Sequence, residues 1–199
     1  MIKVKLGCVI LAGGKSSRMG SDKAFLEWNG KNFIKRLTDE LDFFEEKMIA
    51  HGNRREIKET TWSVIEDIYP DRGPIGGLHA ALTACNSDAL FCVTCDVPLV
   101  QCSLVTFLQN QLDETCDAVV PMAEDGRHHP LCAIYRKTTA SAFKKQIEEG
   151  NNRIMNALEH MRVKFVRVED VELACQLFNV NTQEDYLKLQ KLYPLGHPL

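Results

Sequence analysis

Short apolar runs alternate with amphipathic helical patterns along almost the whole chain, and this alternation constrains the fold more than any other feature. Runs such as residues 8–11 and 90–93 are apolar at every position rather than at every second one. Continuous apolar strands are expected where helices cover both faces of a parallel sheet. The rhythm of strand, helix and strand therefore predicts an α/β fold with a mostly parallel central sheet.

The expected elements follow from these patterns. Strands are predicted at residues 6–11, 47–51, 62–66, 89–94, 118–121, 131–135 and 163–168. Helices are predicted at residues 32–44, 75–84, 103–111, 139–148, 152–159 and 182–192. The chain shows no repeat, low-complexity segment or break in composition, so we expect residues 1–199 to form a single domain.

Composition excludes several classes of protein. The 45% apolar and 26% charged fractions are typical of a soluble globular domain. No apolar run approaches the roughly 18 residues that span a bilayer, and the first residues do not form a secretory signal, so we expect a cytoplasmic protein without a membrane partner. The net charge of −3 argues against nucleic acid as a partner. Any anion that binds must be held by a local cluster of cations.

The eight cysteines do not indicate a disulfide framework, because a chain of this size builds a core without one. Cys8, Cys92 and Cys132 lie inside apolar runs, where a thiol behaves as a small hydrophobic side chain. Cys92 and Cys95 form one C-x-x-C without a second, so zinc is not expected. We interpret the cysteines as reduced thiols.

The loop after the first predicted strand reads LAGGKSSRMGSDK, residues 11–23, and is rich in glycine and cations. It is not a Walker A loop, because the first glycine of that motif would fall on Val9. It also lacks the G-x-G-x-x-G fingerprint of dinucleotide-binding proteins. The remaining phosphate-binding interpretation is a longer glycine-rich loop that carries its own cations.

In this interpretation, Gly13 and Gly14 let backbone N–H groups approach an anion without a side chain in the way. Lys15, Arg18 and Lys23 would then neutralise a triphosphate. Arg18 offers a planar fork for pairs of oxygens, whereas Lys23 offers a point charge. The alternative is a solvated turn with scattered cations.

Ligands of open α/β sheets bind outside the carboxyl ends of the strands, and an acidic residue follows two of the predicted strands. Asp96 follows the strand at residues 89–94 and is placed to hold Mg²⁺, which takes only one or two protein carboxylates. The alternative for Asp96 is a turn-forming or helix-capping role.

Asp67 follows the strand at residues 62–66, and a carboxylate there could accept from both N1–H and the N2 amino group of guanine. Asp71 competes for this role, and a plain surface acid is the alternative for either. The next helix is predicted to begin with N–H groups free to receive an anion. The residues that form this helix start are Gly73, Pro74, Gly76 and Gly77.

Two motifs carry a resemblance to a known family. The segment Leu11-Ala12-Gly13-Gly14-x-Ser16-x-Arg18-Met19-Gly20-x-Asp22-Lys23 resembles the signature loop of the molybdenum cofactor guanylyltransferase (molybdopterin-guanine dinucleotide biosynthesis protein A) family, and Cys95-Asp96-x-Pro98 resembles its metal-binding segment. The resemblance implies a Rossmann-like three-layer nucleotidyltransferase fold. It implies catalytic roles for Arg18, Lys23 and Asp96, with Asp96 as the Mg²⁺ ligand. The residues that it implies for binding the nucleotide, metal and pterin are Leu11, Ala12, Gly13, Gly14, Lys23, His51, Asp67, Asp96, Asn179 and Asn181.

Some of these positions have other interpretations. His51 stands where many family members carry asparagine, although histidine can still form a hydrogen bond with base or ribose. The alternative at the end of the chain is a simpler one, in which Asn181 or Thr182 caps the last helix. His129-Pro130 matches a His-Pro of the family that shapes the cleft, and Arg153 matches a family arginine.

The resemblance implies an enzyme that transfers GMP from GTP to the molybdenum-molybdopterin cofactor with release of pyrophosphate. The terminal phosphate of the pterin would attack the α-phosphate in line, and as an anion it needs no protein base. The alternatives are cytidylyl transfer to the pterin, another nucleotidyltransferase of the same fold, and a non-catalytic nucleotide-binding protein. We expect a monomer, with transient contacts to other cofactor-biosynthesis proteins and to the molybdoenzymes that accept the product.

Overall fold

The computed structural model describes residues 4–13, 26–52 and 60–193, and the predicted phosphate-binding residues Gly14, Lys15, Arg18 and Lys23 lie outside them. Strands and helices alternate along the chain, as the sequence predicts. The strands are β1 (Leu6–Leu11), β2 (Glu27–Trp28), β3 (Lys31–Asn32), β4 (Lys47–Ala50), β5 (Ser63–Ile65), β6 (Ala89–Thr94), β7 (Ala118–Met122), β8 (Cys132–Arg136) and β9 (Val163–Arg167). The α-helices are α1 (Phe33–Glu40), α2 (Pro74–Ala84), α3 (Cys102–Gln109), α4 (Ala140–Glu148), α5 (Ile154–Leu158), α6 (Val171–Cys175) and α7 (Gln183–Leu192).

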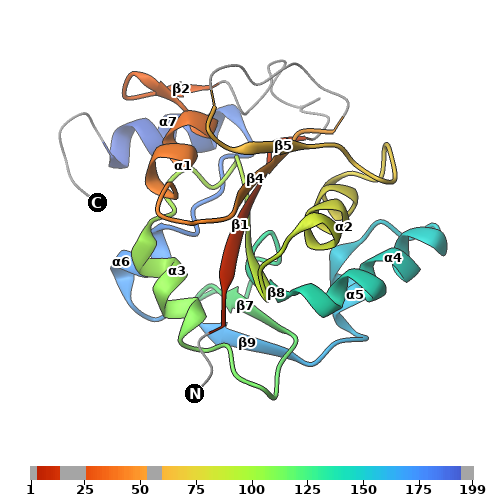
Figure 1. The fold of residues 1–199 in the computed structure, drawn as a ribbon. Coiled ribbons are helices and arrows are strands. Elements are labelled where there is room, and N and C mark those ends of the chain that lie inside the picture. Colours follow the sequence, from red (N-terminus) through yellow and green to blue (C-terminus); the bar gives the residue numbers. More distant parts are fainter. Residues whose placement is uncertain (1–3, 14–25, 53–59, 194–199) are drawn as a thin grey trace.

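Seven strands form the central sheet in the order β5-β4-β1-β6-β8-β7-β9. The pairs β5–β4, β4–β1, β1–β6 and β7–β9 are parallel, whereas β8 is antiparallel to both of its neighbours. The prediction of a mostly parallel sheet is therefore confirmed, with β8 as the exception. In Figure 1, β1 rises from the N-terminal end of the chain, so the carboxyl ends of the parallel strands lie at the top of the view.

Helices cover both faces of this sheet and produce three layers (Figure 1). On one face, Leu37 of α1 and Leu104 of α3 pack with Ile10 and Phe91 of the sheet in one buried cluster. On the other face, α2, α4 and α5 pack in a second buried cluster around Val9, Cys92 and Tyr135. Because β1 and β6 contribute to both clusters, all six residues of β6 are buried. The predicted three-layer α/β fold is confirmed.

The parallel strands end at the same level. Leu11 is paired with Ala50 on one side and with Thr94 on the other, and Ala50 is paired in turn with Ile65. These four residues are also the last residues of β1, β4, β6 and β5. The segments that follow the four strands therefore begin side by side at one edge of the sheet.

Two elements are absent from the sequence prediction. The first is the β2–β3 hairpin, whose turn places Asn29 at φ 52° and Gly30 at φ 74°. Positive φ at both turn residues is the geometry that an Asn-Gly pair favours. The second is α6, which begins after Asp170, whose side chain accepts from the backbone N–H of Leu173. The predicted helix at residues 32–44 was too long, because Asn32 is the N-cap and α1 ends at Glu40.

A third buried cluster attaches the C-terminal helix to the hairpin. It joins Trp28 and Phe33 of the hairpin region with Leu99, Val180 and Leu189. Thr182 caps α7 in a capping box with Asp185, because the Thr182 side chain accepts from the Asp185 N–H and the Asp185 carboxylate accepts from the N–H of Thr182. The segment before α7 is thereby fixed next to the loop that contains Leu99.

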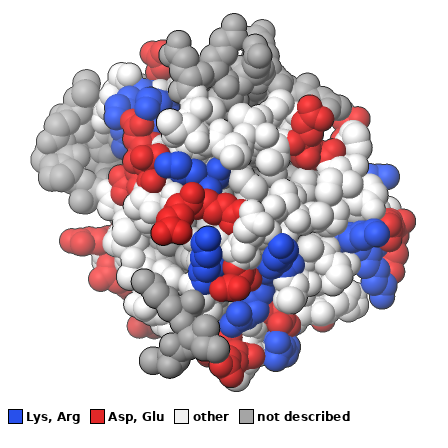
Figure 2. Space-filling view, viewed as in Figure 1, with Lys and Arg blue, Asp and Glu red and all other residues white. Residues whose placement is uncertain are grey.

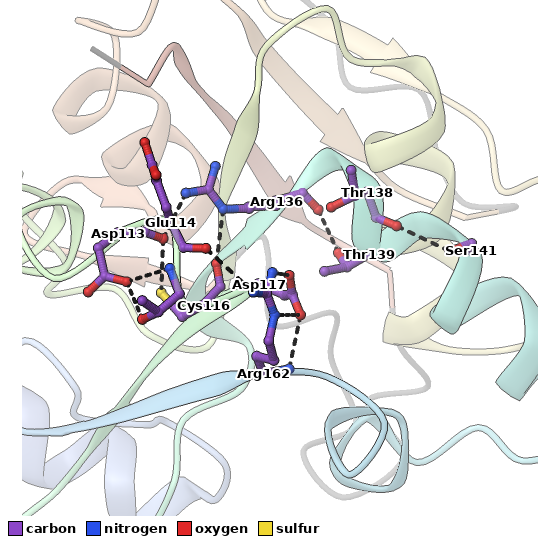
Figure 3. Close-up of polar contacts among 10 residues, drawn as sticks. Asp113, Glu114, Cys116, Asp117, Arg136, Thr138, Thr139, Ser141 and Arg162 are labelled. Carbon is purple, nitrogen blue, oxygen red and sulfur yellow. Dashed lines mark hydrogen bonds and ion pairs between the residues drawn. The ribbon is translucent and has the colours of Figure 1, made fainter. Parts of the chain in front are cut away.

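Polar contacts hold the sheet together at its opposite, amino-terminal edge (Figure 3). Arg162 donates to both carboxylate oxygens of Asp117, at 3.0 and 2.6 Å, where β7 and β9 begin. Arg136, at the end of β8, donates to the backbone carbonyls of Cys116 at 2.9 Å and Asp113 at 2.8 Å. At this edge, charged groups thus connect the start of β7 with the start of β9 and with the end of the reversed strand β8.

The surface shows basic and acidic side chains interspersed on the face seen in Figure 2, without a continuous basic surface among the described residues drawn there. Within the part of the chain that the structure describes, no helix is long and apolar enough to cross a membrane.

Glu46 connects the amino ends of β4 and β6. Its carboxylate accepts from the backbone N–H groups of Asn86 and Ser87, both at 2.7 Å, and from the Ser87 hydroxyl. Partial burial alone would raise the pKa of Glu46, but these hydrogen bonds outweigh burial and lower the pKa below its ordinary value. The charged carboxylate is therefore a stabilising group.

We expect Glu46→Gln to lower the free energy of unfolding at pH 7 by about 1–2 kcal/mol, because an amide cannot accept from both N–H groups with a full charge. A lowered folded pKa contributes stability above the unfolded value of about 4.3 and loses it as pH falls through the folded pKa. The difference between the two proteins should shrink in urea melts below about pH 4. The control is Glu45→Gln, whose side chain is 87% exposed and lies 3.9 Å from Lys5; an equal loss in both variants would contradict the assignment.

Candidate functional site

The segments after β1 and β4 lie against each other. The Ala12 N–H donates to the Ala50 carbonyl at 2.8 Å, which extends the strand pairing by one residue. A Cβ atom on Gly13 would meet the backbone carbon and oxygen of His51 at 3.2 Å. Such contacts are tighter than side chains normally make, so glycine at position 13 permits this close approach. The structure therefore brings together Leu11, Ala12, Gly13 and His51, whose role in binding stays a prediction.

Asp67 lies in a recess formed by three glycines. A Cβ on Gly76 would come within 3.3 Å of Asp67 Oδ2, one on Gly77 within 3.5 Å of Oδ1, and one on Gly52 within 3.8 Å of Oδ2. Glycine at these positions lets the backbone of residue 52 and of the start of α2 approach both carboxylate oxygens without a side chain in between.

Asp67 Oδ1 is buried and has no hydrogen-bond partner among the described residues, and the same holds for Nδ1 of His51. Burial raises the pKa of Asp67, an effect that His51 opposes and Asp71 adds to. A buried acceptor without a partner costs free energy, so its retention at this position points to a ligand that donates to it. Both unpaired atoms lie at the edge where β4 and β5 end.

Asp71, the competing acid, has a different position. It is exposed and has a φ of 59°, a left-handed conformation that aspartate tolerates in turns. Asp71 contributes to shaping the loop that leads to α2, whereas Asp67 faces the glycine recess. The geometry thus favours Asp67 over Asp71 as the acceptor.

Helix α2 starts beside Asp67, as the sequence predicts. Gly73 is its N-cap at φ 69°, and Pro74 is its first residue, where the missing N–H costs nothing. No side chain among the described residues caps this end. Gly76 and Gly77 occupy the first turn, so the glycine recess and the helix start are one feature of the structure.

Asp96 lies at the same edge, after β6. Its carboxylate oxygen Oδ1 accepts from the hydroxyl of Thr94, which is two residues earlier. Its backbone carbonyl accepts from the N–H of Val180 at 2.8 Å. The N–H of Cys95 donates to the Leu11 carbonyl at 3.4 Å, which continues the pairing of β6 with β1. The contacts with Thr94 and Val180 thus hold Asp96 directly, and the contact of Cys95 fixes the residue before it.

The bond between Asp96 and Val180 explains how residues 179–181 reach the site. Asn179 and Asn181 flank Val180, so both lie next to the backbone of Asp96. The capping alternative holds for Thr182, and the Asn181 N–H donates to the Asp185 carboxylate at 3.0 Å. Their predicted place at the metal side of the site agrees with this geometry, and their contacts with substrate remain a prediction.

The residues present fit Mg²⁺ but not a metal held entirely by protein. Among residues 4–13, 26–52 and 60–193, no three His, Cys, Asp or Glu side chains converge on one metal position. Asp96, oriented by Thr94, is the carboxylate at this edge that the sequence assigns to the metal. Mg²⁺ typically takes one or two carboxylates and completes its octahedron with water and phosphate oxygens. Asp96 suits that role.

The turn between β7 and β8 also reaches this edge. His129 is buried, and its N–H donates to the Pro121 carbonyl at 2.9 Å. The His128 ring stacks against Phe165 instead, with ring centroids 4.3 Å apart. Arg153, which matches a family arginine, lies farther along the chain as the exposed N-cap of α5.

Comparisons with known proteins agree with this geometry. Residues 8–163 match the family described as "MobA-like NTP transferase domain". The chain belongs to this family. A relative from Clostridium perfringens, named "Probable molybdenum cofactor guanylyltransferase", is 34% identical over 196 residues, which cover 94% of this chain and 98% of the relative. The resemblance read from the two sequence motifs is thus confirmed.

Solved structures of similar proteins share the MobA-like fold. Molybdopterin-guanine dinucleotide biosynthesis protein A from Archaeoglobus fulgidus superposes with a TM-score of 0.81 at 25% identity, covering 94% of this chain and 97% of that one. The 2-C-methyl-D-erythritol 4-phosphate cytidylyltransferase from Thermus thermophilus has a TM-score of 0.71 at 16% identity, covering 96% of this chain and 98% of that one. The second comparison shows the fold alone.

Two residues that hold the site of this MobA-like chain in place were not predicted from the sequence. Thr94 orients the Asp96 carboxylate, and the signal for it is a hydroxyl two residues before an acid at a strand end. Tyr69 donates to Glu148 at 3.0 Å and ties the loop after Asp67 to the end of α4. No local pattern predicts the second contact, because its partners are 79 residues apart.

We expect Asp67→Asn to raise the free energy of unfolding at pH 7 by about 1 kcal/mol, roughly 2–4 °C in melting temperature, because it removes a half-buried charge whose Oδ1 has no hydrogen-bond partner among the described residues. A folded pKa above the unfolded value means that the wild-type protein regains stability as pH falls through the folded pKa. The gain of the variant should therefore disappear below about pH 4. Thermal melts between pH 4 and 8 measure it.

The matched control is Glu66→Gln, an exposed acid next in the chain, which should leave the melting temperature unchanged. A loss of stability in Asp67→Asn at pH 7 would show that the carboxylate already has a hydrogen-bond partner within the protein and needs none from a ligand.

Proposed function

We propose that the protein transfers GMP from GTP to the phosphate of the molybdenum-molybdopterin cofactor. The observation that carries the proposal is the pair of acids at one sheet edge, Asp67 in a glycine recess and Asp96 beside residues 179–181. Family membership and the name of the relative from Clostridium perfringens support the same reaction. We infer that Asp67 receives the guanine base and that Asp96 lies at the phosphates.

Guanine is the base that suits the recess. Its N1–H and N2 amino group form adjacent donors on one flat edge, and a single carboxylate accepts from both. Adenine, cytosine and uracil do not present two adjacent donors of this kind. The unpaired Oδ1 of Asp67 would gain a partner, which offsets the cost of keeping a carboxylate in a half-buried site.

The reaction requires positioning more than acid–base chemistry. An oxygen of the pterin phosphate forms a bond to the α-phosphorus of GTP, the bond to the β-phosphate oxygen breaks, and pyrophosphate leaves. The attacking oxygen is an anion at neutral pH, so no residue needs to remove a proton. Residues 11–13 and α2 would hold the nucleotide, and residues 179–181 would border the acceptor.

Charge neutralisation is the remaining requirement. When bound at Asp96, Mg²⁺ would neutralise phosphate oxygens and help to align them. Arg18 and Lys23, which lie outside the described residues, are proposed to supply further positive charge from the loop after β1. The chain's own contribution at Asp96 is orientation, because Thr94 and the backbone of Val180 hold the residue in place.

The other proposals concern the protein as a whole. We treat the chain as one nucleotidyltransferase domain, since the sheet runs from β1 to β9 and the family match spans residues 8–163. The eight cysteines are free thiols, which supports the cytoplasm as its compartment. We also propose that the protein acts as a monomer.

We expect GTP with Mg²⁺ to raise the melting temperature more than ATP, CTP or UTP at equal concentration, because ligand binding stabilises the folded state by mass action. Asp67→Asn should bind GTP about tenfold more weakly and lose the preference among nucleotides. Glu66→Gln should behave as the wild type. A larger shift with CTP would reassign the protein to cytidylyl transfer.

Asp96→Asn should lower the rate of pyrophosphate release from GTP and the pterin acceptor by at least about 100-fold, because several kcal/mol of charge stabilisation is lost. The control is Asp88→Asn, an acid at the opposite end of β6 that accepts from the Lys5 N–H at 2.8 Å. Normal turnover by a folded Asp96→Asn variant would refute the assignment of this residue. Binding of GTP by the wild type without turnover in the presence of acceptor would favour a non-catalytic protein.

A further inference from the structure

His129 is a buried histidine that the proposed reaction does not use. Its side chain is 6% exposed, and its Nε2 atom is buried without a hydrogen-bond partner among the described residues. A neutral imidazole has one donor and one acceptor nitrogen, and a buried one ordinarily uses both. An unpaired ring nitrogen in a well-packed turn needs an explanation.

The backbone contacts place His129 next to the Asp96 centre. Its carbonyl accepts from Cys132 at 3.0 Å, which begins β8, and the Leu131 carbonyl accepts from the N–H of Thr94 at 3.1 Å. Thr94 in turn donates to the Asp96 carboxylate. The turn that carries His129 is therefore connected to the loop that carries Asp96 through the hydrogen bond between Leu131 and Thr94.

Burial favours the neutral form of the His129 ring and lowers its pKa, and Arg127 lowers it further, while Asp125 and Asp96 oppose this shift. Asp96 is thus among the charged groups near the ring, in agreement with the backbone contacts that place this turn beside the Asp96 loop. A neutral ring near a metal-binding carboxylate offers a lone pair that can accept a hydrogen bond.

We propose that His129 is a positioning residue, whose Nε2 accepts a hydrogen bond from a water molecule bound to the metal at Asp96. Mg²⁺ keeps several waters, and each bound water is a strong donor that needs an acceptor. Outer partners of this kind orient the ligands of a metal and contribute to its affinity. The inference rests on the proposed metal role of Asp96.

The test is a Mn²⁺ titration of the protein in the presence of GTP, followed by water-proton relaxation, which detects water on the bound ion. His129→Leu, which has no acceptor, should weaken Mn²⁺ binding about tenfold. His129→Gln, whose amide oxygen can accept, should stay within about threefold of the wild type. GTP binding measured in EDTA should not change in either variant.

The matched control is His79→Leu on α2. His79 is 4% exposed and also has an unpaired buried nitrogen, Nδ1, but its charged neighbours are Lys144 and Glu148 of α4. This variant should bind Mn²⁺ as the wild type does. Should His129→Leu fail to fold, His129→Phe supplies a second ring without an acceptor.

The outcomes separate this inference from the proposed function. Mn²⁺ binding by His129→Leu equal to that of the wild type, with binding lost in Asp96→Asn, overturns the role of His129 alone. Equal Mn²⁺ binding by the wild type and Asp96→Asn overturns the metal site and this inference with it. Weaker GTP binding in EDTA with unchanged Mn²⁺ binding makes His129 a nucleotide contact and overturns the proposal.

Discussion

The register of four parallel strands is the constraint on which the rest of the structure depends. Leu11, Ala50, Ile65 and Thr94 lie in one row across the sheet, and each is the last residue of its strand. Ala12, Gly13, His51, Asp67 and Asp96 all follow a residue of this row, and the segment around Val180 is bonded to Asp96. A shift of one residue in any pair would turn the next side chains to the opposite face of the sheet and separate the acids from the glycines.

The two acids of the site differ in how the protein holds them. Asp67 has a buried oxygen without a partner among the described residues, and its charge is disfavoured by burial. Asp96 receives a hydroxyl from Thr94 and is anchored through its backbone to Val180. The first arrangement suits a neutral ligand with donors, and the second suits a cation that needs an oriented carboxylate. Under the proposed function, the edge of the sheet would have a base end at β4 and β5 and a phosphate end at β6.

Much of this could be predicted from the sequence, because continuous apolar runs and strand-following acids are local signals. These signals predict the three-layer fold and the position of Asp67, Asp96 and Gly13 at one edge of the sheet. The direction of β8 could not be predicted, since an apolar run of five residues reads alike in either direction. The bond between Asp96 and Val180 joins residues 84 positions apart, and no local pattern contains it. The place of His129 depends on the direction of β8, which explains why the family resemblance implied only a role in shaping the cleft for it.

The reversal of β8 has a consequence for how such a protein can diversify. Because β8 runs against its neighbours, β7 and β8 are joined by a short turn at the ligand-binding edge rather than by a helix crossing the sheet. This turn lies at the phosphate end, away from the recess around Asp67. Surface turns accept insertions and substitutions more readily than strands do. Under the proposed function, lengthening residues 123–128 would change the phosphate end while leaving the base end intact, so the two ends of the site could vary independently.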